Sequence, residues 1–468
     1  MNNSKWFALI LLKFYTIATQ YISFKNLLKQ EVITIKDFYE VIIVGAGPAG
    51  SSAALICAQN NLSVALIERG EYPGSKNMFG GVIYSKPTSS IIPAFWEKAP
   101  IERPITRDQL WFMDHDSAVQ FGFHGKRFNN APYNKFTVIR SKFDKWFASR
   151  AKKAGADLFT STTVTDIVYE KKGIMNEKAG GVILENGKKI KSNVVVIAEG
   201  LVGNLTQKTG LSKEQNTDSR GIYVKEILSL PKNTIEERFN IDQNEGANMA
   251  MVGFPTSGAV GKGGIWTNKN SISIVVGVFL NQVISKNLNP YQLLQRFKDH
   301  PMIKSFISGA KKLEYQSHII PKGGIKDRPQ MYDNGLLIAG DALMMVGGEG
   351  TAFAMLSGKY AAETIIEAQA KHRFDKSILA NYKNKMDELY ITKNNKNKEN
   401  EKKYNKDFSD ADLLLAKALN KIAYNLTAYD METNKQKAKK IYKAIKTLQP
   451  LPKTLKEIII GLKNWRVL

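Results

Sequence analysis

A short glycine-rich segment and a later acid have the residue types that bind a diphosphate and a ribose. Gly45, Gly47 and Gly50 have the spacing G-x-G-x-x-G. Glycines at these three places permit a tight turn, a close approach of the backbone to phosphate, and close packing of a helix on a strand. Glu68 follows by about 20 residues, and a carboxylate at that distance accepts hydrogen bonds from ribose hydroxyls. The pattern predicts a dinucleotide site.

The elements that must position these residues are also recognisable. Residues 39–44 (YEVIIV) form an apolar run typical of a buried parallel strand, residues 51–59 (SSAALICAQ) predict a helix, and residues 64–67 predict a second strand. Together they form a βαβ unit whose helix N-terminus faces the diphosphate. Because strand, helix, second strand and acid occur in order, the motif is much more specific than its glycines alone.

Two later segments indicate that the chain returns to the same sheet. Residues 193–197 (NVVVI) predict a buried strand that ends at Ala198. Residues 335–339 (GLLIA) predict another strand, which ends at Gly340 and Asp341. A flavin-binding chain needs this late return, because its Asp contacts the ribityl or pyrophosphate region and the next helix directs its positive N-terminus at the flavin ring. The predicted cofactor is therefore FAD.

Composition excludes several protein classes. The chain has 468 residues, 43% of them hydrophobic, and its 67 basic and 43 acidic residues give a net charge of +24. With a mean hydropathy of −0.27, these values exclude a polytopic membrane protein and a wholly disordered chain. The single cysteine, Cys57, excludes a disulfide within the chain, a four-cysteine iron–sulfur cluster and a cysteine-based zinc finger. The histidines lack metal-ligand spacing, so no metal site is predicted.

The two ends of the chain differ from its middle. Residues 6–22 are apolar and aromatic but shorter than a membrane span of about 20 residues, so an extension, a packed helix and a peripheral membrane helix all stay open. From Lys371 onward there are 23 basic and 11 acidic residues, which suit an anionic partner or a solvated surface. Nucleic acid is not predicted as a partner, because no aromatic-and-basic recognition motif accompanies the charge. Residues 393–406 predict a linker and residues 411–426 a helix.

Further segments carry a family resemblance: residues 68–77 (ERGEYPGSKN), 99–106 (APIERPIT), 136–146 (FTVIRSKFDKW), 198–200 (AEG), 267–269 (TNK), 318–321 (HIIP) and 323–324 (GG). With them, the chain from about Asp37 to Lys371 resembles the FixC family. These flavoproteins are similar to electron-transfer-flavoprotein:quinone oxidoreductases, within the superfamily of geranylgeranyl reductases and p-hydroxybenzoate hydroxylase-like enzymes. The loop after Asp341 is shorter than is common in the family, and Ala352 stands where Asn is frequent.

The resemblance implies an α/β fold with a discontinuous Rossmann-like FAD-binding domain of the glutathione-reductase type, an antiparallel-sheet substrate domain and a helical C-terminal region. An apolar extension (1–37) precedes the oxidoreductase core (38–371), and a basic Lys/Asn-rich region (372–468) follows it. Within the core, the FAD-binding parts are expected at about 38–90, 135–215 and 315–371, and the substrate-side sheet at about 91–134 and 216–314.

By the same resemblance, the glycine motif and Glu68 hold the ADP half of FAD, Val164 lies in the strand beside adenine, and Asp341 holds the ribityl chain. Arg140 corresponds to an arginine near the flavin phosphates; alternatively, it forms an ordinary surface ion pair with Asp144 one turn on. The complete predicted FAD site comprises Gly45, Gly47, Ala49, Gly50, Glu68, Arg69, Gly80, Arg140, Val164, Ala198, Gly200, Gly340, Asp341 and Gly350. No catalytic residue is predicted.

The function that the resemblance implies is that of a FAD-dependent oxidoreductase, passing electrons from an electron-transfer flavoprotein to a quinone or a ferredoxin-like acceptor. Because Cys57 alone cannot ligate a cluster, an iron–sulfur centre would belong to a separate ferredoxin-like subunit. The expected location is the cytoplasm, with peripheral contact to the inner face of the cell membrane through the apolar N-terminal segment and the basic tail.

Other functions stay open. A geranylgeranyl (prenyl-chain) reductase would saturate lipid double bonds, but residues 250–255 (AMVGFP) keep only the Phe-Pro of that family's lipid-binding motif and lack its earlier aromatics. A flavin monooxygenase or halogenase is less favoured, because Glu199 and Gly200 stand where hydroxylases have Asp-Gly. From a different class, the chain could be a flavin-binding subunit that is active only within an electron-transfer complex.

Overall fold

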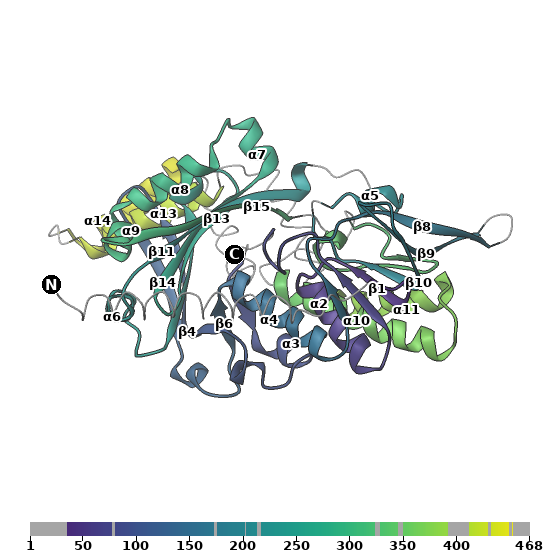
Figure 1. Cartoon of the computed structure of the whole chain (residues 1–468). Helices are drawn as coiled ribbons and strands as arrows, with labels where there is room; N and C mark the ends of the chain where they lie inside the picture. Colours follow the sequence, from purple (N-terminus) through teal and green to yellow (C-terminus); the bar gives the residue numbers. More distant parts are fainter. Residues whose placement is uncertain are drawn as a thin grey trace, which may run out of the picture. The chain divides into compact units, whose positions relative to one another are not determined.

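The computed structural model describes residues 35–76, 80–172, 176–201, 203–212, 217–322, 328–344, 350–391, 411–428 and 432–448, together with Pro452. The chain divides into two compact units, residues 1–37 and 38–468, and the elements below belong to the second (Figure 1). The expectations for the apolar segment 6–22, for the linker 393–406, and for most of the loop between Asp341 and Gly350 lie outside the described residues.

The first sheet has a parallel core. In the described part of the chain its strands have the order β16-β17-β10-β1-β2-β7, and a β8–β9 hairpin joins β10. The pairs from β17 to β7 are all parallel, and their apolar runs are buried, as a sheet covered by helices requires. The strands are β1 (Phe38–Val44), β2 (Val64–Ile67), β7 (Asp157–Phe159), β8 (Val164–Lys172), β9 (Asn176–Leu184), β10 (Lys189–Ile197), β16 (Tyr332–Asp333) and β17 (Leu336–Ile338).

Two helices that follow strands of this sheet pack closely together. A Cβ atom on Gly358 of α10 would lie 2.0 Å from the carbonyl oxygen of Ala49 in α2, so only glycine permits the approach. Because α2 follows β1 and α10 follows β17, both helices begin at the carboxyl edge of the parallel strands. The helices of this half are α2 (Pro48–Gln59), α3 (Ser85–Ser89), α4 (Arg140–Lys153), α5 (Leu205–Lys208), α10 (Gly350–Ala370) and α11 (Lys376–Ile391).

The second sheet is largely antiparallel. Its order is β15-β11-β14-β13-β12-β4-β6-β3, with β5 paired to β4, and the β4–β12 pair is parallel. One face packs on α6, α8 and α9 to form a second core. The elements are β3 (Val82–Tyr84), β4 (Ile101–Met113), β5 (Ala118–His124), β6 (Lys135–Val138), β11 (Arg220–Ser229), β12 (Gly246–Gly253), β13 (Gly261–Thr267), β14 (Ser271–Phe279), β15 (Lys311–Pro321), α6 (Lys232–Phe239), α7 (Leu280–Ser285), α8 (Pro290–Asp299) and α9 (Pro301–Ile307).

The long strand β4 joins two parts of the second sheet. Its first residues pair with β6, and its later residues pair with β5 and β12. Consequently β3 and β6 belong to the second sheet, although the predicted boundaries put their residues with the FAD-binding parts. The domain limits stay a prediction, because neither sheet is a continuous stretch of sequence.

The C-terminal region contributes helices α13 (Ala411–Thr427) and α14 (Asn434–Leu448), so the helix predicted at 411–426 is confirmed. Leu415 and Ala416 of α13 pack against Phe112 of β4 and Val252 of β12. The Asn420 amide donates a hydrogen bond to the Phe112 carbonyl oxygen at 2.8 Å. The predicted α/β fold class, with its second sheet and helical C-terminal region, is confirmed. Within the described ranges, no helix combines the length and apolarity needed to cross a membrane.

Candidate functional site

A cavity of about 1050 Å³ extends from the first sheet to one face of the second. Its lining includes the carboxyl ends of β1, β2 and β10, the first turns of α2, α4 and α10, and residues of β4, β11, β12, β13 and β15. Every residue of the predicted FAD site lines this cavity except Gly50. Ligands of open parallel sheets bind at this carboxyl edge, and the fold brings the predicted residues together there from widely separated positions.

The three glycines of the motif have different surroundings. Gly45 has φ +101°, and a Cβ there would lie 2.3 Å from the Ala198 carbonyl oxygen. A Cβ on Gly50 would lie 1.8 Å from the Gly45 carbonyl oxygen, so Gly50 lets α2 close on β1. Gly47 is the opposite case, because a Cβ there would meet no atom within 4 Å and would occupy the cavity. No side chain caps the start of α2, an arrangement that suits a bound phosphate.

Glu68 is held in place at the end of β2. Its Oε2 accepts a hydrogen bond from the Ala46 N–H at 2.9 Å, and its Oε1 accepts one from the Gly70 N–H at 2.7 Å. Each carboxylate oxygen has a second lone pair. Glu68 lines the cavity, so these lone pairs are available to ribose hydroxyls. Arg69 lies exposed at the cavity wall, and Val164 lines it from β8.

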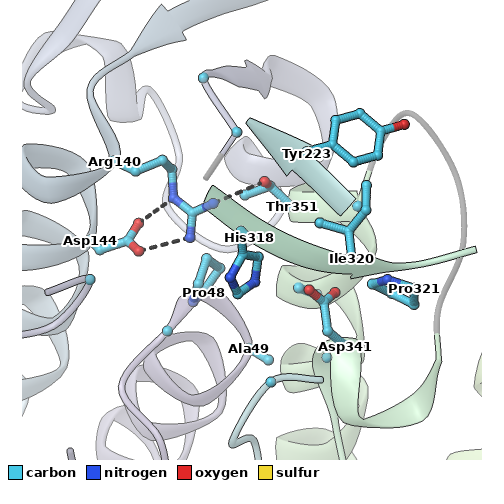
Figure 2. A pocket seen from close by; sticks show the side chains of 18 of the residues that line it. Pro48, Ala49, Arg140, Asp144, Tyr223, His318, Ile320, Pro321, Asp341 and Thr351 are labelled. Carbon is cyan, nitrogen blue, oxygen red and sulfur yellow. Dashed lines mark hydrogen bonds and ion pairs between the residues drawn. The ribbon is translucent and has the colours of Figure 1, made fainter. Parts of the chain in front are cut away.

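Arg140 begins α4 with a buried guanidinium (Figure 2). Its Nε and Nη2 donate to the two Asp144 carboxylate oxygens at 2.7 and 2.8 Å, and its Nη1 donates to Thr351 Oγ1 at 3.5 Å. The two charged side chains are only 6% and 1% exposed. The ion pair with Asp144 therefore exists, but it is buried at the cavity wall and is not the surface pair of the alternative interpretation. A Cβ on Gly80 (φ +90°) would lie 3.4 Å from Arg140 Nη1.

The turn after β10 contains a residue whose role the sequence did not indicate. Ala198 and Gly200 line the cavity, and Gly200 has φ +77° with no atom within 4 Å of a Cβ position. The Glu199 carboxylate accepts hydrogen bonds from the Leu205 and Thr206 N–H groups at 3.1 and 2.7 Å. Glu199 therefore holds the start of α5, which explains in physical terms why an acid stands in this turn.

Asp341 follows β17 on the cavity wall. Gly340, with φ +70°, donates its N–H to Ser357 Oγ at 2.9 Å and so fixes the turn against α10. Burial raises the pKa of Asp341 to about 6, although the Arg140 charge opposes the rise. Gly350 begins α10 with no atom within 4 Å of a Cβ position. A carboxyl group that ionises near neutral pH thus lies at the same edge as two helix N-termini.

The second sheet adds a histidine that was not predicted as a site residue. His318 of β15 pairs in register with Tyr223 of β11, and both line the cavity. Figure 2 shows His318 between Arg140 and Asp341. Burial, followed by the Arg140 charge, lowers the pKa of His318 to about 4, so the imidazole is neutral at physiological pH. Only the pairing of β11 with β15, distant in sequence, brings this residue to the site.

Lys225 lies behind the cavity wall, two residues after Tyr223 on the same strand. Its Nζ donates to the Gly80 carbonyl oxygen at 3.3 Å and lies 5.8 Å from the centre of the Trp266 ring. The side chain is only 2% exposed. Burial, followed by the Arg140 charge, lowers the pKa of Lys225 to about 7. A lysine that titrates near neutrality therefore supports the Gly80 backbone.

A polar group lies farther along the cavity-lining face. Asp108 of β4 stands beside Asn248 of β12 and opposite Phe123 of β5. The Lys135 ammonium and the Asn248 amide both donate to Asp108 Oδ1, at 2.7 and 3.0 Å. All four residues line the cavity. None of them was predicted, because each is a single residue in a different strand and no local motif marks it.

The residues present fit FAD. The open space at Gly47 and the uncapped start of α2 suit a diphosphate, and the free lone pairs of Glu68 suit a ribose. Asp341 and the start of α10 would hold the ribityl and ring portions. FAD accepts two electrons and can pass them on singly. The chain itself supplies Arg140, His318 and Asp341 around the cavity, and these groups set the local charge.

Comparisons with known proteins agree with this geometry. Residues 40–258 match the family model described as FAD dependent oxidoreductase, and residues 221–320 match the one described as ETF-QO, ubiquinone-binding. Protein FixC of Azotobacter vinelandii is 39% identical over 361 residues, which cover 76% of this chain and 82% of that protein. Protein FixC of Escherichia coli K12 is 35% identical over 353 residues, covering 74% and 81%.

Solved structures share the fold at low sequence identity. A geranylgeranyl bacteriochlorophyll reductase-like protein of Thermoplasma acidophilum has a TM-score of 0.63 at 18% identity, covering 92% of this chain and all of that one. The myxobacterial chondrochloren halogenase has a TM-score of 0.61 at 16% identity, covering 92% and 91%. The fold, the FAD-shaped site and the FixC relatives lead to one conclusion: the chain belongs to the FixC family of FAD-dependent oxidoreductases.

Proposed function

We propose that this protein uses FAD to pass electrons from an electron-transfer flavoprotein to a quinone, together with a separate ferredoxin-like iron–sulfur subunit. The observation that carries the proposal is the continuity of the cavity. The same space that is lined by Gly47 and Asp341 is also lined by Tyr223, Trp266 and His318, from the segment that matches a ubiquinone-binding family. A quinone held by that segment would therefore share one cavity with the cofactor.

The charges around the cavity suit a reaction that moves protons as well as electrons. Conversion of a quinone to a quinol takes up two electrons and two protons. The Asp341 carboxyl and the Lys225 ammonium, with pKa values of about 6 and 7, can release protons near neutral pH. The neutral His318 imidazole can donate or accept a hydrogen bond beside these groups. These three groups come from β11, β15 and η6 (Gly340–Leu343), and the Arg140 charge lowers the pKa of each.

The proposed partner set follows from what the chain lacks and from its relatives. Cys57 is the single cysteine of these 468 residues, and it is buried in α2, so this sequence cannot ligate an iron–sulfur cluster and the proposal assigns the cluster to a separate subunit. The FixC relatives and the ETF-QO family match support an electron-transfer flavoprotein as donor. A ferredoxin-like subunit would then receive single electrons on the way to, or in parallel with, the quinone.

An anaerobic stopped-flow experiment tests the proposal. The FAD-loaded protein is mixed with reduced electron-transfer flavoprotein while flavin absorbance is followed, and a short-chain ubiquinone is then added. We expect rapid reduction of the bound FAD, followed by reoxidation when the quinone arrives. A flavin that stays oxidised with this donor, yet after dithionite reduction saturates prenyl double bonds, would instead establish a prenyl-chain reductase. Activity that appears only when small subunits copurify would identify an obligate complex subunit.

We further propose that the protein is cytoplasmic and lies peripherally on the inner face of the cell membrane. Exposed lysines on α14 support this, namely Lys435, Lys439, Lys440, Lys443 and Lys446, with Tyr442 54% exposed among them. A basic helix with an exposed aromatic attracts anionic lipid. Sedimentation with vesicles of phosphatidylglycerol should recover the protein at low salt, whereas vesicles of phosphatidylcholine should not. Equal recovery with both would contradict the proposal.

A further inference from the structure

We propose that the polar group Asp108, Lys135 and Asn248 binds a carbonyl oxygen of the quinone ring at the sheet end of the cavity. This inference rests on the proposed function and names the residues that recognise its acceptor. Asp108 and Lys135 lie outside the segment 221–320 that matches the ubiquinone-binding family. The geometry of strands β4, β6 and β12 is what brings all three residues to one wall.

The hydrogen-bonding state of the group leaves donors for a ligand. Asp108 Oδ1 accepts from both Lys135 Nζ and Asn248 Nδ2, which fixes the positions of the two nitrogen atoms. An ammonium has three N–H donors and an amide nitrogen has two. Since the pair Lys135–Asp108 carries no net charge, it suits a neutral acceptor, and a quinone carbonyl is such an acceptor. The Lys135 side chain lines the cavity and is only 12% exposed.

The surface beside this group is apolar. One step along the same sheet face, Leu110 of β4 stands beside Ala250 of β12, which stands beside Gly264 of β13. All three line the cavity. Small side chains at two of the three positions leave room for a planar ring above the sheet. A ring placed over them has its edge at Lys135 and Asn248, so apolar contact and hydrogen bonding act on opposite parts of one ligand.

An aromatic side chain lies beside the polar group, on the neighbouring strand β5. Phe123 stands opposite Asp108 on β5, lines the cavity, and is 51% exposed. An exposed phenyl group beside a polar group is suited to the isoprenoid tail that leaves a quinone ring. On the same face of the sheet, α13 packs beside this part of the cavity, because Leu415 and Ala416 lie in one cluster with Leu110.

The test measures binding rather than turnover. Oxidised, FAD-loaded protein is titrated calorimetrically with a ubiquinone of one isoprene unit. We expect Lys135→Met and Asn248→Leu each to raise the Kd about tenfold or more, the loss of one to two good hydrogen bonds. Lys262→Met is the matched control, because Lys262 also lines the cavity from β13 but is not part of the group. Its Kd should change less than about twofold, and a change as large as that of Lys135→Met would overturn the proposal.

A double variant separates binding from simple charge balance. If Lys135 served only as the counterion of Asp108, then Lys135→Met combined with Asp108→Asn would bind quinone as tightly as the wild type. The proposal requires the double variant to bind as weakly as Lys135→Met. Phe123→Ser should also abolish the gain in affinity that the wild type shows as isoprene units are added. Tight binding by the wild type with unchanged Kd in every variant would refute this inference alone, whereas no binding by the wild type would contradict the proposed function.

Discussion

The two ends of the cavity are built in different ways. At the first-sheet end, the backbone shapes the cavity: Gly47 leaves open space, and the start of α2 is uncapped. At the second-sheet end, side chains shape the cavity, such as Lys135 and Asn248, which are held by hydrogen bonds to Asp108. A backbone site needs glycines at fixed spacing, so it leaves a motif in the sequence. A side-chain site needs only that strands pair in the right register, and it leaves none.

The largest expected effect comes from substitutions in the glycine turn. Gly50→Val should unfold the protein, because its Cβ would lie 1.8 Å from the Gly45 carbonyl oxygen, and we expect a cost of about 5 kcal/mol or more. Gly47→Val should fold normally but bind no FAD, since its side chain would fill the cavity. Thermal unfolding of the apoprotein and the flavin-to-protein absorbance ratio measure the two effects. Similar melting curves for both variants would contradict the distinction between fold and ligand.

The next effect concerns the buried ion pair beneath the cavity. Arg140→Met leaves the Asp144 carboxylate buried without its partner, and we expect a loss of about 3–5 kcal/mol in the free energy of unfolding. The double variant Arg140→Met/Asp144→Leu should recover much of that loss while still binding FAD weakly. Urea unfolding and FAD titration of the three proteins give the answer. A double variant as unstable as the single one would show that the pair is not the cause.

The pH dependence of stability extends the comparison to Lys225 in the second sheet. Its folded pKa of about 7 lies below the ordinary value of 10.5, so the unfolded chain binds more protons between these pH values. Stability contributed by this group is therefore lost as pH falls from about 10 toward 7. Lys225→Met should raise the apoprotein's free energy of unfolding near pH 7 by a few kcal/mol, which is about the free-energy equivalent of the pKa shift. The free energy of unfolding of the variant should also rise less steeply between pH 7 and about pH 9.5 than that of the wild type.

Urea unfolding at the two pH values measures that slope. Lys152→Met is the control, because Lys152 is exposed on the outer part of α4. The control should keep the pH dependence of the wild type. If Lys225→Met also kept it, the lysine would not carry a lowered pKa in the folded protein.

The smallest expected effect concerns the C-terminal helix α13. Asn420→Ala removes the amide that donates to the Phe112 carbonyl oxygen, and we expect a loss of about 1 kcal/mol. FAD content should stay normal, because α13 packs on β4 and β12 of the second sheet. Differential scanning calorimetry and the flavin absorbance ratio check both statements. A fall in FAD content would mean that the two ends of the cavity are coupled more tightly than their construction indicates.

The same contrast explains which parts of the molecule the sequence could predict. The βαβ unit, the returns at Ala198 and Asp341, and the helix at 411–426 were predictable because each depends on a local run of apolar or small residues. Lys225 and His318 could not be predicted as site residues, because only the pairing of β11 with β15 brings their two strands together. The sequence alone could not decide between the two interpretations of Arg140, because an i, i+4 pair with Asp144 has the same spacing on a surface helix and at a cavity wall.

The packing of α13 on strands β4 and β12 has a consequence for how the protein can diversify. The wall that carries Leu110 and Ala250 is supported by α13, which lies outside both segments that match known families. The cavity wall and the helix that packs on it are therefore encoded in separate stretches of the gene. Substitutions along α13 can change the packing around Leu110 and Ala250 while the cofactor-binding strands stay unaltered. The packing at the apolar end of the cavity can thus change independently of the glycine motif.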